Sequence, residues 1–516
     1  MHRLLPHLLL ALQAAPTAQQ RTYYISPSGS DAAPGTSPST AWLTAARASQ
    51  LILQPGDAVL FEAGATPHEL GGAGLLVRGA GPVRVAAYGG GGARALLHVD
   101  AHLTFGVRAT DVAGGVEVSN LTLLHTGADK ALFNGVEALS TGAAARLPGA
   151  VSLHDLEAGN FSTGVYIGAA GCGGFSSVRI ARATAWGSLA SGIASEGAYG
   201  AGCKSHADVE VSDCTARDNP GDAANARSWS GSGIVLSGID GALITRSTAY
   251  RNGGRNGHAG GGPVGIWLWN THNGTISHSL AFANSNGHPS GSSNDGGGFD
   301  LDGGCSACVI EYCLSYNNSG PGFLVCSFGG PDATVNNTVR YSVSYNDGRV
   351  SGNGAAGVNF FTPDALAGLA IYGNTLVSSH PTLPLLAPTP FGVPASRVSI
   401  ASNALLALNG APLLAMPPAQ SPAGVAVSGN AYWGGRAGAF AVQWQGMAYA
   451  SLEAFRAGSG QERTPQGAPT GSDSDPHAAP SAFFAPCVPA APAGEAAIPS
   501  IPNSPVLDAM RGFSGC

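Results

Sequence analysis

Charged side chains are scarce in this sequence. Asp, Glu, Lys and Arg make up 11% of its 516 residues, against about 25% in ordinary globular proteins, and Lys130 and Lys204 are its only lysines. The formal net charge is −7, which gives no indication of a basic surface patch. Nucleic acids and anionic membrane surfaces are therefore poor partners, because both bind through clustered positive charge.

Long apolar runs are also rare. The run at residues 4–12 is too short to span a bilayer. It follows His2 and Arg3 and precedes small residues at 15–18, which predicts a secretory signal peptide over residues 1–18, with a disordered tail as the alternative. Nine cysteines suit an oxidising compartment. We expect a secreted, disulfide-bonded, monomeric glycoprotein with no membrane partner, whose N-glycosylation sequons begin at Asn120, Asn160, Asn273, Asn317 and Asn336.

Glycine, by contrast, is abundant, with 76 residues, and hydrophobic residues reach 44%. A ten-residue pattern recurs most clearly from residues 210, 243, 275, 309 and 338, with a period of about 27 to 35 residues. Its second position is branched and apolar, its fifth is small, its eighth is mostly aromatic and its tenth is Asn or Asp. Helical periodicity is absent. The pattern predicts stacked coils, with aromatic stacks and Asn ladders along their axis.

A second strand follows each ten-residue pattern after a loop of variable length. Its inward positions are predicted to be Ile234, Ile266, Phe299, Phe323 and Val358. Two outward rows result: one contains Val235, Trp267, Asp300, Leu324 and Asn359, and the other contains Ser237, Trp269, Asp302, Cys326 and Phe361. Because neighbouring coils lie about 4.8 Å apart, the two tryptophans are expected directly beside the two aspartates.

The repeats, the segment Tyr23–Thr36, the segment Pro55–Phe61 and the closing segment Asn503–Asp508 resemble the right-handed parallel β-helix, or pectin-lyase-like, superfamily. The resemblance implies an all-β fold: one right-handed parallel β-helix over residues 21–460. It also implies a helix near residues 44–53 that caps the N-terminal end of the core. Residues 461–516, rich in Pro and Ala, are expected to form an irregular, extended C-terminal tail.

The same resemblance implies lyases, hydrolases and epimerases that act on acidic polysaccharides. Family-nine pectate lyases share the opening segment and use an aspartate calcium cluster with a lysine base; here no lysine follows Lys204. Alginate epimerases carry Phe-Asp-Pro-His-Asp. Residues 299–302, Phe-Asp-Leu-Asp, are similar but lack the His and one residue of the spacing. The Gly-His-Gly motif of polygalacturonases is absent. The fold is therefore better specified than the activity.

The candidate site is the strand Gly298–Asp302, where alternation places both aspartates on the outward face. Long loops before this strand and its neighbours should wall a groove. The predicted catalytic residues are Asp300, Asp302, His258 and His288; the predicted sugar-binding residues are Trp267, Trp269, Trp229 and Arg255; and a possible Ca²⁺ site is formed by Asp295, Asp300 and Asp302. Alternatively, the aspartates are a solvated edge, the tryptophans pack under a loop and the histidines are bystanders.

We therefore predict a secreted protein acting on polysaccharide, most simply by β-elimination on a uronate-containing chain. A hydrolase or epimerase of the same fold, or a non-catalytic glycan-binding solenoid, are the alternatives. For Cys305, Cys308, Cys313 and Cys326, a disulfide between the first two or a pair linking loops is favoured over a zinc site.

Overall fold

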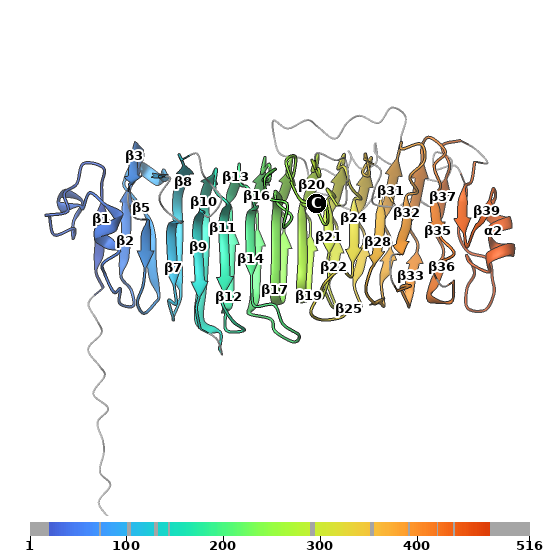
Figure 1. The fold of residues 1–516 in the computed structure, drawn as a ribbon, viewed down its shortest axis with the longest axis horizontal. Helices are drawn as coiled ribbons and strands as arrows, with labels where there is room; N and C mark the ends of the chain where they lie inside the picture. The colour runs from blue at the N-terminus through green and yellow to red at the C-terminus, as the bar shows by residue number, and fades with distance from the viewer. Residues whose placement is uncertain are drawn as a thin grey trace, which may run out of the picture.

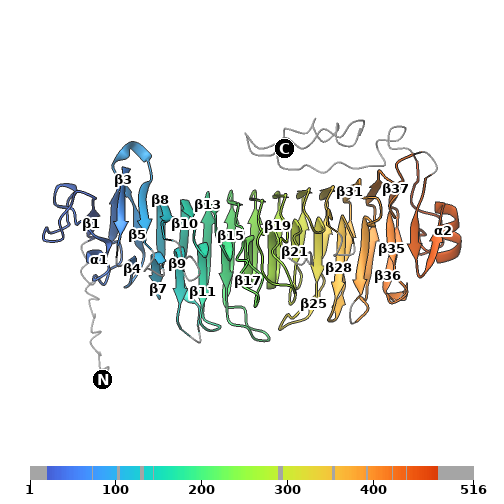
Figure 2. The same ribbon diagram turned by 45° about the horizontal axis from the view of Figure 1, so that its top comes forward.

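Most turns of the chain contribute three short parallel strands, which stack on the equivalent strands of neighbouring turns into three faces of a long β-solenoid (Figures 1 and 2). The computed structural model describes residues 20–71, 74–100, 105–127, 133–142, 145–288, 295–350, 355–390, 393–420, 422–436 and 439–474. The predicted signal peptide, Lys130 and most of the tail, with Cys487 and Cys516, lie outside these residues.

The first face carries the start of the recurring pattern. Its strands are β1 (Thr22–Ile25), β2 (Ala58–Glu62), β5 (Val83–Tyr88), the first part of β8 (Val116–His125) and of β10 (Leu147–Gly159), β12 (Phe175–Ala181), β15 (His206–Ser212), the second part of β17 (Ser232–Thr245) and of β19 (Ile266–Ser277), β22 (Val309–Glu311), β26 (Thr338–Arg340), β30 (Ala370–Tyr372), β33 (Val398–Ala401) and β36 (Val425–Ser428).

The second face carries the aromatic position of the pattern. Its strands are β3 (Gly64–Leu70), β6 (Ala95–Val99), the ends of β8 and β10, β13 (Thr184–Trp186), β16 (Thr215–Arg217), β18 (Thr248–Tyr250), β20 (Leu280–Phe282), β23 (Leu314–Tyr316), β27 (Val343–Tyr345), β31 (Thr375–Ser378), β34 (Ala404–Ala407) and β37 (Ala431–Trp433).

The third face carries the candidate site. Its strands are β4 (Leu75–Val77), β7 (Phe105–Thr110), β9 (Asn134–Ser140), β11 (Thr163–Ala169), β14 (Ser191–Glu196), the first part of β17 and β19, β21 (Phe299–Leu301), β24 (Phe323–Cys326), β28 (Val358–Thr362), β32 (Leu386–Pro390), β35 (Leu414–Met416) and β38 (Val442–Trp444). The antiparallel β39 (Met447–Tyr449) follows β38, and a two-stranded pair joins β25 (Thr334–Val335) to β29 (Leu366–Ala367).

The core of the solenoid is a continuous apolar column enclosed by the three faces. The predicted inward side chains Ile234, Ile266, Phe299, Phe323 and Val358 all lie in it and are fully buried. One side of every strand faces the core, where its side chains pack against those of the turns above and below. This packing accounts for the short apolar runs in these strands. The inward row predicted from the repeat is therefore confirmed.

Both predicted ladders are present. Tyr250 and Phe282 stack with ring centroids 4.7 Å apart, and Phe282 stacks on Tyr316 at 4.8 Å. In the first Asn column, each amide Nδ2 donates to the side-chain Oδ1 of the next turn at 2.8–2.9 Å. This column contains Asn219, Asn252, Asn284, Asn318 and Asp347. A second column at another corner contains Asn374, Asn403, Asn430 and Glu462.

Short helices close both ends of the core. At the N-terminal end, α1 (Ala45–Ala48) buries Ala45 and Ala48 and is shorter than the predicted helix. At the other end, α2 (Leu452–Ser459) buries Leu452 and Phe455. A solenoid needs such caps, because its terminal turns would otherwise expose apolar side chains.

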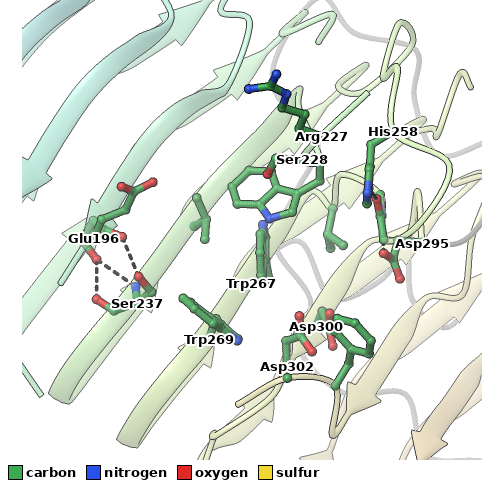
Figure 3. Close-up of a pocket in the computed structure, with 18 of the residues that line it drawn as sticks. Glu196, Arg227, Ser228, Ser237, His258, Trp267, Trp269, Asp295, Asp300 and Asp302 are labelled. Atoms are coloured by element: carbon green, nitrogen blue, oxygen red, sulfur yellow. Dashed lines mark hydrogen bonds between the residues drawn. The ribbon is translucent and has the colours of Figure 1, made fainter. Parts of the chain in front are cut away.

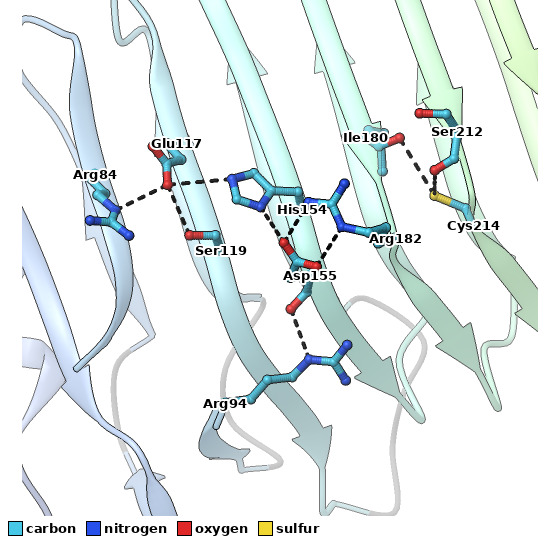
Figure 4. Close-up of polar contacts among 10 residues, drawn as sticks. All are labelled: Arg84, Arg94, Glu117, Ser119, His154, Asp155, Ile180, Arg182, Ser212 and Cys214. Carbon is cyan, nitrogen blue, oxygen red and sulfur yellow. Dashed lines mark hydrogen bonds and ion pairs between the residues drawn. The ribbon is translucent and has the colours of Figure 1, made fainter. Parts of the chain in front are cut away.

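The outer surface of the first turns carries a row of ion pairs (Figure 4). Arg182 donates two hydrogen bonds of 2.7 Å to the Asp155 carboxylate, and His154 contacts the same carboxylate at 2.7 Å. Arg182 holds the pKa of Asp155 well below its usual range, against a smaller opposing effect of burial. Arg182 is exposed, and pairs of this kind contribute little stability because water screens them.

Candidate functional site

A pocket of about 320 Å³, partly open to solvent, lies on the third face (Figure 3). Its floor is formed by β17, β19 and the segment that contains β21. One wall comes from the loops that precede these strands, and the other comes from residues that follow β14 and β24. The polar and aromatic lining side chains are Ser195, Glu196, Arg227, Ser228, Trp229, Ser237, His258, Trp267, Trp269, Asp295, Asp300, Asp302 and Phe328.

The register of the strands places tryptophans beside aspartates, as the repeat predicts. Trp267 pairs with Asp300 in the parallel ladder, and the Asp302 N–H donates to the Leu268 carbonyl at 2.9 Å. Phe299 on the same strand belongs to the apolar core. Because alternate side chains point to opposite sides of a strand, the carboxylates point away from the core and into the pocket.

The prediction that both aspartates face water is wrong for Asp300, which is only 2% exposed. Asp300 lies in the parallel ladder between Trp267 and Leu324, whereas Asp295 and Asp302 keep partial exposure along the pocket. The Asp300 Oδ1 has no hydrogen-bond partner among the residues that the structure describes. A buried carboxyl oxygen without a partner is costly unless the group is protonated or meets a ligand.

Burial raises the pKa of all three pocket carboxyls, to different extents. It raises the pKa of Asp295 to about 6, although the Gly262 N–H donates to its Oδ2 at 2.5 Å. Burial and then the charge of Asp295 raise the pKa of Asp302 to about 7. Burial, followed by Asp302 and Asp295, raises the pKa of Asp300 well above the usual range. Near neutral pH the pocket therefore holds both protonated and ionised carboxyls.

The tryptophans differ in what they offer to a ligand. Trp267 is 4% exposed, donates from Nε1 to Ser232 Oγ at 3.2 Å and meets the ring of Trp229 edge to face, with centroids 5.0 Å apart. It therefore belongs to the packed floor. Trp269 is half-buried and stacks on Tyr199, with centroids 5.4 Å apart. Trp269 and Trp229 therefore offer more ring surface to a ligand than Trp267 does.

Two residues predicted for the site do not line the pocket. Arg255 is exposed and His288 is half-buried, and neither is among the lining residues. His258 does line it, with Nδ1 2.9 Å from the Gly261 carbonyl. Arg227, which is not among the residues predicted for the site, is the one Lys or Arg among the described lining residues.

The cysteines depart from the predicted pattern. Cys305, Cys308, Cys313 and Cys326 are all free and buried, so neither a disulfide between the first two nor another pair among these four is present. The Sγ atoms of Cys305 and Cys308 instead donate to backbone carbonyls of the neighbouring turn, each at 3.3 Å. The observed disulfide joins Cys172 to Cys203, 31 residues apart. That separation equals one turn of the repeat, which is the signal that could have identified this pair.

Within the described part of the chain, no group of three or more His, Cys, Asp or Glu side chains is arranged to hold a metal ion. This holds for Asp295, Asp300 and Asp302 as well as for the cysteines. Calcium binding stays a prediction, and no step below depends on it. In the same part of the chain, no helix is long and apolar enough to cross a membrane.

The raised carboxyl pKa values predict that the site destabilises the fold at neutral pH. The folded state keeps these protons to higher pH than the unfolded state, which releases them near pH 4. Stability should therefore fall as pH rises from about 4 to 7. We expect Asp300→Asn to be more stable than the wild type at pH 7.5 by on the order of 1 kcal/mol, and this gain to shrink at pH 5. Denaturant midpoints at the two pH values measure this; a gain that is equal at both would contradict it.

Fold and pocket together define the class: a parallel β-helix with an acidic, aromatic pocket on one face. Residues 159–376 match the family model for a right handed beta helix region, and with the parallel turns of the structure this match confirms the predicted fold. No curated protein matches the sequence.

Several solved structures are similar to this chain. The GH136 lacto-N-biosidase from Eubacterium ramulus has 17% sequence identity and a TM-score of 0.49, and the match covers 68% of this chain and 64% of that one. The chain thus spans less than two thirds of that protein. Pectate lyase Pel9A has 15% identity and a TM-score of 0.41, with 74% and 79% covered. XylC in complex with xylose has 10% identity and a TM-score of 0.39, with 80% and 84% covered.

Proposed function

We propose that this protein is a carbohydrate-active enzyme that cleaves a glycosidic bond with carboxyl groups as acid and base. The observation that carries the proposal is the set of three aspartates in one pocket, whose pKa values are raised to different levels. Acid–base cleavage of a glycoside needs one carboxyl that is protonated and one that is ionised at the same pH. The ring surfaces of Trp269 and Trp229 suit a sugar.

The order of the pKa values suggests the roles. Between pH 6 and 7, Asp295 is mostly ionised and Asp302 is mostly protonated. In hydrolysis, Asp302 would give its proton to the glycosidic oxygen as the bond to the sugar carbon breaks. Ionised Asp295 would either take a proton from the attacking water or attack that carbon itself. Asp300 would stay protonated and donate a hydrogen bond to a sugar hydroxyl.

The charge of the pocket favours a neutral sugar at the reacting position. A uronate carboxylate would enter beside three aspartates and Glu196, and repulsion would raise their pKa values further. This supports hydrolysis over the β-elimination expected from the sequence. Elimination stays the second candidate because Arg227 lines the pocket and could pair with a substrate carboxylate.

A panel of linear glycans tests the proposal: xylan, β-mannan, chitin oligosaccharides, polygalacturonate and alginate. Hydrolysis would release reducing ends from a neutral glycan without new ultraviolet absorbance. Elimination would release ends together with the absorbance of an unsaturated uronate. Binding without any new ends, unchanged by Asp302→Asn, would instead favour a non-catalytic glycan-binding protein.

The same assay should show a narrow pH optimum. We expect kcat/KM to rise as Asp295 ionises near pH 6 and to fall as Asp302 loses its proton near pH 7. The maximum should therefore lie between these values. A profile that is flat from pH 5 to 8 would contradict the assignment of these two carboxyls.

A further inference from the structure

Residues 197–204, which we call the strap, form a loop beside the pocket that the repeat pattern does not predict. The loop joins β14 to β15 and is tied to its own part of the solenoid. Cys203 is disulfide-bonded to Cys172 in the preceding turn. The Ala198 N–H donates to Ser205 Oγ at 2.9 Å. Both ends of the strap are therefore tied to the solenoid.

The strap also contacts turns that follow it by up to 130 residues. Gly202 N–H donates to Asp332 Oδ1 at 2.9 Å, and Lys204 Nζ lies 2.9 Å from Asp332 Oδ2. Lys204 also donates to Asn270 Oδ1, beside Trp269. Lys204 is only 12% exposed and lowers the pKa of Asp332. This ion pair is thus better shielded from water than the surface pairs of the first turns.

Tyr199 connects the strap to the aromatic wall of the pocket. Its ring stacks on Trp269 with an interplanar angle of 22°, and its hydroxyl donates to the Gly329 carbonyl. Trp269 and Gly329 line the pocket, whereas Tyr199 does not. Tyr199 therefore supports the indole from outside the pocket. It does so although it is 61% exposed, so these two contacts rather than burial hold it in place.

We propose that the strap fixes Trp269 as the sugar-binding wall of the pocket, with Tyr199 as the positioning residue and the Lys204–Asp332 ion pair as the lock. The sugar role of Trp269 rests on the proposed function, whereas the lock does not. An aromatic wall that is held before binding loses less side-chain freedom when a sugar stacks on it. The strap does not touch Asp295 or Asp302 in any contact above, so its loss should weaken binding and spare the chemistry.

Steady-state kinetics on the panel glycan that the wild type cleaves fastest test the positioning role. Tyr199→Ala should raise KM about tenfold and leave kcat within about twofold. Tyr199→Phe keeps the ring and should restore KM to within about twofold of the wild type. Tyr341→Ala removes another exposed, stacked tyrosine, away from the pocket, and should change neither constant. An unchanged KM in Tyr199→Ala, or an equal effect of Tyr341→Ala, would overturn this role.

Hydrogen exchange of the full-length protein tests the lock without any substrate. In Lys204→Met, peptides from residues 197–204 and 328–332 should exchange about tenfold faster, while β15 stays protected. Unchanged exchange in both peptides would overturn the lock. If the wild type cleaves no glycan of the panel, the proposed function and the sugar role of Trp269 both fail, and the exchange result still decides whether the strap is locked.

Discussion

Asp302→Asn is expected to lower kcat on the cleaved glycan by about 10²- to 10⁴-fold, the range typical of a lost general acid. The asparagine amide keeps the size of the side chain but cannot give its proton to a leaving oxygen. The Oδ1 atom should still accept the 2.7 Å hydrogen bond from the Gly303 N–H, so the local turn is preserved. Binding should therefore change less than turnover, and KM should stay within a few-fold of the wild type.

A matched control separates chemistry from folding. Asp240→Asn makes the same substitution at an exposed position of β17, away from the pocket, and should retain full activity. Asp302→Asn should also match the wild type in circular dichroism and be at least as stable at pH 7.5, because it removes a buried carboxyl with a raised pKa. Retention of wild-type kcat by Asp302→Asn would remove this residue from the catalytic role.

Asn284→Ala is expected to destabilise the solenoid by about 3–5 kcal/mol, because it interrupts the first Asn column in its interior. The Asn284 amide Nδ2 donates to the Ala249 carbonyl at 3.1 Å and to Asn318 Oδ1 at 2.9 Å. Its Oδ1 accepts from the backbone N–H and the side-chain Nδ2 of Asn252. Alanine would leave these groups buried without their partners, and each such group costs about 1–3 kcal/mol.

The midpoint of denaturant unfolding measures this loss, and Asn409→Ala is its control. Asn409 is exposed and donates a single hydrogen bond, to the Ser379 carbonyl at 2.6 Å. Water can replace that bond, so we expect a change of less than about 1 kcal/mol. If the two variants unfold at the same denaturant concentration, the Asn column is not the stabilising element that its geometry indicates.

The repeat in the sequence was sufficient to predict the fold and the register of the strands that carry the site. Equivalent positions stack in a solenoid, so the spacing alone placed Trp267 beside Asp300 and both ladders along the axis. The family resemblance also implied the N-terminal capping helix, although α1 is shorter than the predicted helix. These features depend on contacts between neighbouring turns, which the period of the sequence encodes directly.

The residues that surround the site could not be predicted from the period of the repeat. The lining of the pocket includes residues of loops that follow no period, and the contact between Tyr199 and Gly329 joins residues 130 positions apart. The same loops decide that Arg227 lines the pocket and Arg255 does not. Burial in turn sets the carboxyl pKa values, so the acid and base roles required the structure, even though all three aspartates were identified from the sequence.

The two Asn columns also bear on how long this solenoid can grow. Every asparagine amide accepts from the turn before it and donates to the turn after it, so a duplicated turn could be inserted within a column with all amides satisfied. Asp347 and Glu462 accept a hydrogen bond from the preceding turn, but a carboxylate has no N–H group to donate to the following turn. Each of them ends its column, so internal duplication of a turn should be tolerated inside an Asn column and resisted next to Asp347 or Glu462, where a column ends.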